Sequence, residues 1–150
     1  MRFLIQRVRE ASVTVEGEIT GQIGQGYLVL LGVCDTDTEA EADRMCQKLL
    51  KLRINADAEG KTNLALSDVG GEILLVSQFT LYADCRKGNR PSFTRGGSAE
   101  HANRLYEYVQ KKLRESGAHV ETGIFGAHMD VALLNDGPFT VLLDSDELSR

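Results

Sequence analysis

The sequence predicts an α+β fold, in which a largely antiparallel sheet or open barrel packs against two helices in a single domain over residues 1–150. Short runs of β-branched and aliphatic residues recur between glycine-rich turns, which is typical of strands. Two longer segments carry apolar residues at helical spacing. The 150 residues contain no internal repeat, low-complexity tract or interdomain linker.

The first part of the chain predicts strands. Residues 3–8 begin with β-forming side chains, and residues 11–16 alternate with period two, which places Ser12, Thr14 and Glu16 on one face. Glu16-Gly17 is a turn signal, so we expect a short strand through Ile19 to return as a hairpin. Residues 27–33 form an apolar run, which is typical of a strand buried on both faces.

Two helices follow from capping residues and apolar stripes. Thr38 and Glu41 resemble a capping box, and the first helix continues to about Arg53. Ser98 is the expected cap of the second helix, which runs to about Ser116 and ends at Gly117. The two stripes are Ala42, Met45, Cys46, Leu49 and Leu52, and Ala102, Leu105, Tyr106, Val109 and Leu113.

The other segments alternate strand with loop or turn. We expect a loop over 55–71 with a short strand near 64–66, a strong central strand over 72–81, and a loop over 84–97. The predicted tail consists of a strand at 120–122, a loop at 123–127, a strand at 129–134, a turn at 135–138 and a strand at 139–143.

Composition narrows the class of protein. With 42% hydrophobic and 26% charged residues, the chain resembles an ordinary globular protein. No stretch approaches the ~18 apolar residues of a membrane span, and the N-terminal apolar run is too short for a signal peptide. A net charge of −5 argues against extensive phosphate contacts, but it allows a pocket that recognises a nucleic-acid end.

Cysteine and histidine usage indicates a cytoplasmic protein without a metal site or cofactor. The three cysteines are far apart, odd in number and form no C-x-x-C motif, which fits a reducing compartment. The three histidines show no metal-ligand spacing.

Two short polar segments are candidates for a functional site. Residues 77–80, Ser-Gln-Phe-Thr, follow the aliphatic run of the central strand, where a rigid strand end can present polar groups. Residues 135–140, Asn-Asp-Gly-Pro-Phe-Thr, contain a Gly-Pro bond, at which a cis form costs far less than elsewhere. Taken singly, the first segment is better interpreted as a strand end and the second as a turn.

Together, SQFTL and NDGPFT resemble the D-aminoacyl-tRNA deacylases. Other segments carry the same resemblance, namely IQRV, ASVTVEGE and GxGYLVLLGV in residues 1–33, GNRPSF at 88–93 and TGIFGAHMDV at 122–131. The resemblance covers essentially the whole chain. It departs at His128, where an acidic residue is more usual, and this leaves the detailed shape of a pocket there open.

The resemblance implies a homodimeric hydrolase with active sites at the subunit interface. One subunit would line the site with Ser77, Gln78, Phe79 and Thr80. The partner would insert Gly137-Pro138 as the Gly-cisPro motif of the family. An L-residue would drive its side chain into that backbone, so the enzyme would select D-aminoacyl-tRNA by steric rejection. Glycyl-tRNA, including glycine mischarged on tRNA-Ala, would also be a substrate.

The resemblance also implies supporting roles. Arg7 matches the arginine that holds the Gly-Pro loop, although an ordinary solvated strand arginine is the simpler interpretation of the residue itself. Phe125 and Met129 match positions around the terminal adenine of the tRNA 3′ end, and core packing is the alternative. A basic loop with Arg86, Lys87, Arg90 and Arg95 could meet tRNA phosphates or could simply be solvated.

Two mechanisms and two other functions stay open. Thr80 could be a nucleophile, which needs a nearby base. We favour the alternative, in which backbone N–H groups near Phe79 and Thr80 stabilise the oxyanion and the ribose 2′-hydroxyl assists water. An esterase without chiral selection and a non-catalytic RNA-binding or scaffold protein are the competing functions.

Overall fold

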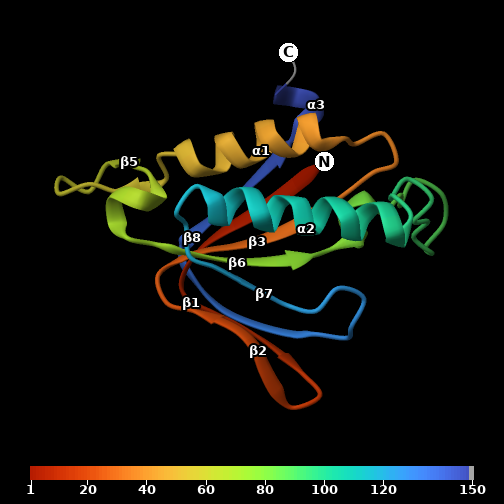
Figure 1. Cartoon of the computed structure of the whole chain (residues 1–150), viewed down its shortest axis with the longest axis horizontal. Helices are drawn as coiled ribbons and strands as arrows, with labels where there is room; N and C mark the ends of the chain where they lie inside the picture. The colour runs from red at the N-terminus through yellow and green to blue at the C-terminus, as the bar shows by residue number, and fades with distance from the viewer. Residues whose placement is uncertain (149–150) are drawn as a thin grey trace.

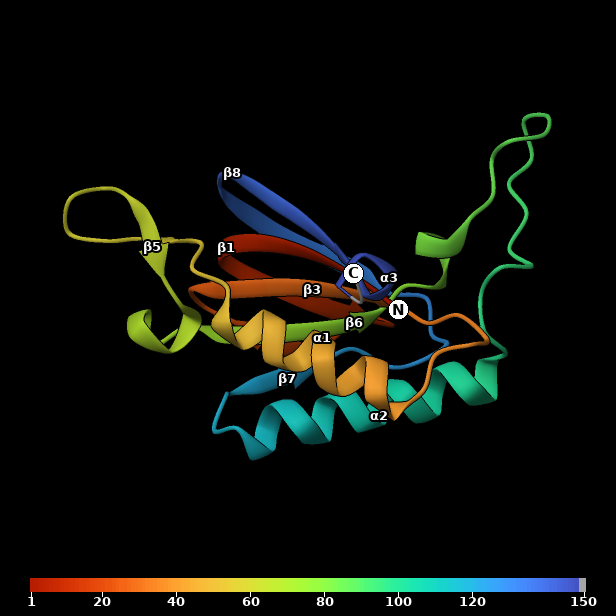
Figure 2. The same cartoon turned by 90° about the horizontal axis from the view of Figure 1, so that it is seen from above.

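Six strands form one mixed sheet, and two long helices lie side by side over one of its faces (Figures 1 and 2). The computed structural model describes residues 1–148. The strands are β1 (Arg2–Val15), β2 (Glu18–Ile23), β3 (Gly26–Gly32), β6 (Glu72–Ser77), β7 (Val120–Thr122) and β8 (Asp130–Asp144), with β4 (Asn55–Ala56) and β5 (Thr62–Leu64) as a separate pair. The helices are α1 (Glu39–Lys51), α2 (Ala99–Glu115) and α3 (Ser145–Leu148), with one-turn 3₁₀ helices η1 (Leu66–Val69) and η2 (Phe79–Tyr82).

Strand β1 is the centre of the antiparallel half of the sheet. One of its edges pairs with β8 from Arg2 to Thr14. Its other edge pairs with β2 over 11–15 and with β3 over 2–8. The hairpin between β1 and β2 turns at Glu16 and Gly17, which both have positive φ, as the turn signal predicts.

The other half of the sheet is parallel. The chain crosses from β3 to β6 through α1 and from β6 to β7 through α2, and β6 is parallel to both of its neighbours. At the far end, β7 approaches β2 so closely that a Cβ atom on Gly21 would overlap the carbonyl oxygen of Thr122. The sheet is therefore a nearly closed barrel. The predicted α+β class is confirmed, and the parallel strands are a detail that the prediction lacked.

Two apolar clusters fill the two sides of the sheet. The larger lies beneath the helices and includes Tyr27 and Leu75, and the smaller lies inside the barrel and includes Leu28 and Leu74. Alternate residues of β3 and of β6 therefore enter different clusters. This arrangement confirms that residues 27–33 are buried on both faces.

The helices begin where their caps predict. Thr38 and Glu41 form the capping box of α1, and the hydrogen bond from the Thr38 side chain lowers the pKa of Glu41. Ser98 caps α2 by accepting a hydrogen bond from the His101 backbone. Both predicted stripes face the larger cluster, although Leu52 is the C-terminal cap of α1 and Ala102 is only partly buried.

Three predicted elements differ in their bounds. The central strand stops at Ser77, because Ser77 pairs with Leu31 and no later residue of β3 pairs with β6. Residues 79–82 form η2 instead. The short strand expected near 64–66 is β5 at 62–64, and η1 follows it. Residues 3–8 and 11–15 belong to a single strand, β1, and Glu16 lies in the turn after it.

The tail differs more. A turn at 135–138 was expected between two strands, but β8 continues in the same direction through that segment. Val8 pairs with Asn135 and Gln6 with Thr140, so residues 136–139 have no partner in β1. The Asn-Asp-Gly-Pro segment is thus a bulge rather than a reversal, because β1 extends past it and pairs with both flanks.

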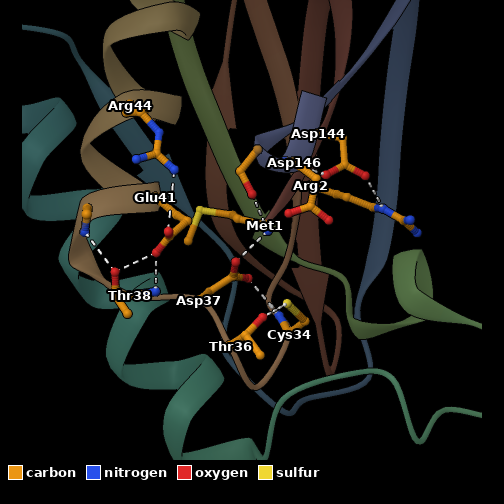
Figure 3. Close-up of polar contacts among 12 residues, drawn as sticks. Met1, Arg2, Cys34, Thr36, Asp37, Thr38, Glu41, Arg44, Asp144 and Asp146 are labelled. Atoms are coloured by element: carbon orange, nitrogen blue, oxygen red, sulfur yellow. Dashed lines mark hydrogen bonds and ion pairs between the residues drawn. The ribbon is translucent and has the colours of Figure 1, made fainter. Parts of the chain in front are cut away.

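The N-terminal ammonium group is buried in a polar contact beneath α1 and α3. It lies 2.6 Å from Asp37 Oδ1 and 2.8 Å from the Ser145 hydroxyl, and Asp37 is only 4% exposed (Figure 3). Asp37 also accepts a hydrogen bond from the Cys34 backbone. Together these contacts tie the start of β1 to the chain before α1 and to the chain after β8.

No helix within residues 1–148 combines the length and the apolarity that crossing a membrane requires.

Asp37→Asn should lower the free energy of unfolding by about 3–5 kcal/mol, because it leaves a buried ammonium group without a counter-charge. Urea denaturation followed by circular dichroism would measure the change. Glu59→Gln is the matched control, since its ion pair with Lys61 is largely exposed and should contribute less than about 1 kcal/mol. Equal stability of Asp37→Asn and the unsubstituted protein would contradict the structural role of this ion pair.

Candidate functional site

A cavity of about 460 Å³ lies where β6 ends, between η2, the start of α2 and the segment after β7. Five predicted site residues line it, namely Ser77, Gln78, Phe79, Phe125 and Met129. His128 lines it as well. A larger cavity of about 620 Å³ lies near the C-terminal ends of α1 and α2, but no predicted site residue lines it. We therefore take the smaller cavity as the candidate site.

Four other predicted residues do not line this cavity within one chain. Thr80 lies one residue beyond its wall, whereas Arg7, Gly137 and Pro138 lie at β1 and β8. Between β8 and β6 lie β1 and β3. The two candidate segments of the sequence therefore occupy separate parts of one chain.

The end of β6 fixes the first segment. Gln78 donates its backbone N–H to the carbonyl of Leu31 at 2.7 Å, which is the last bond of the strand to β3. The chain then turns into η2, where Phe79 and Thr80 contribute the first two backbone N–H groups. The Gln78 side chain does not cap them; instead it donates a hydrogen bond to the Thr80 hydroxyl.

Phe125 and Met129 form another wall of the cavity. The Phe125 ring lies 6.0 Å from that of Tyr106, whose hydroxyl donates to the Leu75 carbonyl at 2.8 Å. Burial raises the pKa of Tyr106 to about 12, so its hydroxyl stays protonated as a donor. Met129 is partly buried against the cluster inside the barrel. Both residues therefore pack against the core and line the cavity.

The cavity wall contains little charge. Of the side chains that line it, within the described part of the chain, only His128 is ionisable. That side chain is 96% exposed, and its Nε2 lies 3.7 Å from Asp130 Oδ1. The cavity is suited to hold an uncharged, partly aromatic group beside backbone donors. Across residues 1–148, no three His, Cys, Asp or Glu side chains are placed to hold a metal ion.

The bulge of β8 has its own hydrogen-bond frame. The peptide bond between Gly137 and Pro138 is cis, and both residues are exposed. Asn135 closes the base of the bulge: its Oδ1 accepts from the Phe139 backbone at 2.6 Å, and its Nδ2 donates to the Phe139 carbonyl and the Thr140 hydroxyl. The side chain of Asn135 thus holds the bulge in one shape.

Arg7 supports the bulge from β1. Its Nε donates to the Asp136 carbonyl at 2.9 Å, and its Nη1 donates to the Ile54 carbonyl at 2.6 Å. The guanidinium carbon also lies 4.6 Å from the centre of the Phe139 ring. An ordinary solvated strand arginine is excluded by these contacts, because the side chain is only 16% exposed.

Phe93 is an aromatic residue of the cavity that the sequence did not predict. It lines the cavity, and its ring meets that of Phe79 edge to face with centroids 5.1 Å apart. It lies within GNRPSF, a segment that contributes to the family resemblance, but its place beside Phe79 depends on how loop 84–97 folds back.

Comparisons with known proteins identify the family. The family model described as D-Tyr-tRNA(Tyr) deacylase matches residues 4–144. A D-aminoacyl-tRNA deacylase from Desulfitobacterium hafniense is 56% identical over 147 residues, which cover 98% of this chain and 99% of the relative. A D-aminoacyl-tRNA deacylase from Thermus aquaticus is 54% identical, with 98% of this chain and 97% of the relative covered.

Two solved structures share the fold. The c-Myc DNA unwinding element binding protein has a TM-score of 0.91 at 41% identity, with 96% of this chain and 98% of that chain covered. A probable eukaryotic D-amino acid tRNA deacylase has a TM-score of 0.81 at 19% identity, with 95% and 97% covered. At that identity, the second similarity shows the fold alone.

Arg7→Lys should lower the free energy of unfolding by about 1–3 kcal/mol, because one ammonium group cannot replace both guanidinium hydrogen bonds to partly buried carbonyls. Thermal and urea denaturation would measure the loss. Arg9→Lys is a close control, since Arg9 also faces Asp136 but is 71% exposed, and its substitution should change stability by less than about 0.5 kcal/mol. Similar losses for the two variants would contradict a specific clamp at Arg7.

Proposed function

Because the chain belongs to the D-Tyr-tRNA(Tyr) deacylase family, we propose that it hydrolyses the ester bond of D-aminoacyl-tRNA and releases the free D-amino acid and tRNA. The observation that carries the proposal is the cavity at the end of β6, where Ser77, Gln78 and Phe79 meet Phe125 and Met129. These polar and stacking groups gather there from separate parts of the sequence. The comparisons support the same activity through relatives that match nearly the full chain.

The substrate end would enter this cavity. The terminal adenine would stack against Phe125 and Met129, since an aromatic ring and a thioether both suit a base. The aminoacyl ester would then lie along residues 77–80, beside the backbone N–H groups of Phe79 and Thr80. No acidic side chain lines the cavity in the described residues, which favours entry of an anionic nucleic-acid end.

Chiral selection would come from the bulge of a second subunit. Gly137 and Pro138 are exposed on β8, which pairs only with β1 in the described sheet, so a partner could receive them. In the partner's site, an L-side chain would collide with this backbone, while a D-side chain would point away. Asn135 and Arg7 support the proposal because their hydrogen bonds hold the bulge in place. Steric rejection of an L-side chain requires a rigid backbone at this position.

A homodimer would bury the exposed apolar residues of β8. Leu133, Leu134 and Leu142 are 37%, 51% and 53% exposed on this edge strand, where unpaired backbone also invites association. Sedimentation should therefore give a species of twice the chain mass. A monomer that hydrolyses the D-ester would contradict a site completed by the partner.

The chemistry would rely on positioning. Water adds to the ester carbonyl, and the oxyanion accepts hydrogen bonds from the backbone N–H groups near Phe79 and Thr80. The bond from the carbonyl carbon to the ribose oxygen then breaks, and that oxygen leaves as a hydroxyl. The vicinal 2′-hydroxyl would assist the water. This pathway is favoured because Thr80 accepts a hydrogen bond from Gln78 and no charged base lines the cavity in the described residues.

A steric filter of this kind extends the substrate range. Glycine has no side chain to reject, so glycyl-tRNA, including glycine mischarged on tRNA-Ala, would also be hydrolysed. The enzyme would remove chiral errors where translation takes place, and the three free cysteines suit a reducing cytoplasm.

Catalytic amounts of enzyme should hydrolyse D-tyrosyl-tRNA and glycyl-tRNA rapidly and L-tyrosyl-tRNA at least about a hundredfold more slowly, since about 2.8 kcal/mol of steric conflict suffices for that ratio. Release of the labelled amino acid measures all three rates. Equal loss of D- and L-tyrosine would indicate an esterase without chiral selection. Binding without turnover of any substrate would favour a non-catalytic RNA-binding protein.

Thr80→Ala should reduce kcat by less than about tenfold if catalysis relies on backbone donors and positioning. Replacement of the terminal adenosine by 2′-deoxyadenosine should cost far more. Single-turnover rates of D-tyrosyl-tRNA hydrolysis test both. If Thr80→Ala abolished turnover while tRNA binding persisted, Thr80 would instead be the nucleophile.

A further inference from the structure

We propose that the basic loop, residues 84–97, and the Phe79–Phe93 ring pair together bind the single-stranded tRNA 3′ end just upstream of the terminal adenosine. This inference rests on the proposed function, which places only the adenosine and its aminoacyl group in the cavity. The nucleotides before the adenosine must leave the cavity past the segments that border it, and these segments differ in chemistry.

The first observation is an exposed aromatic pair at one rim. Phe79 is 58% and Phe93 is 43% exposed, yet both side chains line the cavity. Large apolar rings that stay this exposed offer stacking surfaces, and bases stack on such rings with little regard to sequence. The edge-to-face contact between the rings holds each in place for the other.

The second observation is the positive charge of the loop that contains Phe93. The basic loop carries four basic residues and one acidic residue in a chain of net charge −5. Arg86 pairs with Asp84 at 2.7 Å and holds the pKa of that carboxyl well below its usual range. Lys87 and Arg90 are exposed and form no ion pair within the described residues, so both cations are free to meet phosphates.

The segment after β7, which also borders the cavity, offers no such partner. There the cavity is bordered by Gly126, Ala127 and His128, and the segment 123–134 contains no lysine or arginine. Asp130 lies beside His128 and would repel a phosphate. A polyanion that leaves the cavity is therefore drawn toward the basic loop.

The loop is anchored at its base and projects at its tip. Asp84 and Ser92 exchange two backbone hydrogen bonds of 2.7 and 2.9 Å, and Gly97 donates its N–H to the Val33 carbonyl at 2.9 Å. Figure 2 shows the loop extending past η2 beyond the sheet and helices. A fixed base with an exposed basic tip suits a surface that receives an extended strand.

The test compares two substrates that share the reacting ester. D-Tyrosyl-tRNA has the upstream nucleotides, and 2′(3′)-O-D-tyrosyl-adenosine lacks them. Lys87→Glu combined with Arg90→Glu should lower kcat/KM at least about tenfold on the tRNA and flatten its salt dependence, while the adenosine ester is hydrolysed at the unsubstituted rate. Lys61→Glu with Lys111→Glu makes the same charge change elsewhere and should leave both rates unchanged.

Phe93→Leu tests the aromatic part separately. Leucine keeps apolar bulk beside Phe79 but removes the flat ring, so the KM for tRNA should rise about tenfold, and by more than the KM for the adenosine ester. An equal rise for both substrates would show that Phe93 only shapes the cavity, and would overturn its role upstream of the adenosine.

The remaining outcomes are distinct. Unchanged kcat/KM of the double variant on tRNA, or equal losses on both substrates, would overturn the docking surface. If the double variant sedimented differently from the unsubstituted protein, the loop would instead form a contact between copies of the chain. This outcome would also overturn the tRNA-binding surface. If the unsubstituted protein hydrolysed neither ester, the proposed function would fail. Fluorescence anisotropy with deacylated tRNA would then test the tRNA-binding surface by itself. Weaker tRNA binding by the double variant would support the surface, and equal binding would refute it.

Discussion

Backbone pairing along β1 is the constraint on which the rest of the structure depends. Most of its fourteen residues are paired on both edges, with β8 on one side and with β2 and β3 in succession on the other. Because β1 has only Arg7 between Gln6 and Val8, whereas β8 has residues 136–139 between their partners, the surplus residues of β8 must bulge out of the ladder. The exposed bulge is thus a result of the register between β1 and β8. Arg7 is the β1 residue opposite the bulge, so its side chain can hold the bulge in place.

The same register separates the bulge from the cavity. The cavity forms where the pairing of β6 with β3 ends. The bulge lies in β8, which is separated from β3 and β6 by β1. A single chain therefore holds a pocket with backbone donors in one place and a rigid exposed backbone segment in another. The proposed dimer would unite these halves. Neither half contains a charged catalytic pair in the described residues, so the proposed chemistry depends on shape and on fixed dipoles.

Local signals in the sequence predicted local structure well. The capping box at Thr38, the hairpin turn at Glu16-Gly17 and both helical stripes depend on residues close in the chain, and all are present. The end of β6 and the continuity of β8 could not be predicted in this way, because each depends on whether a distant strand supplies a partner. Phe93 was missed for the same reason, since its contact with Phe79 requires the whole loop to fold back.

The partnership of β1 and β8 also affects the order in which the molecule can form. Phe3 pairs with Leu143 and Arg2 with Asp144, so the earliest strand has its longest partner among the last residues described. During synthesis, β1 can pair with β2 and β3 soon after they emerge, but its other edge stays open until β8 follows. Contacts at this sequence separation slow folding and leave an unpaired edge exposed for longer. A nascent chain would therefore pass through a stage in which a helix-covered sheet still has a vacant place for its final strand.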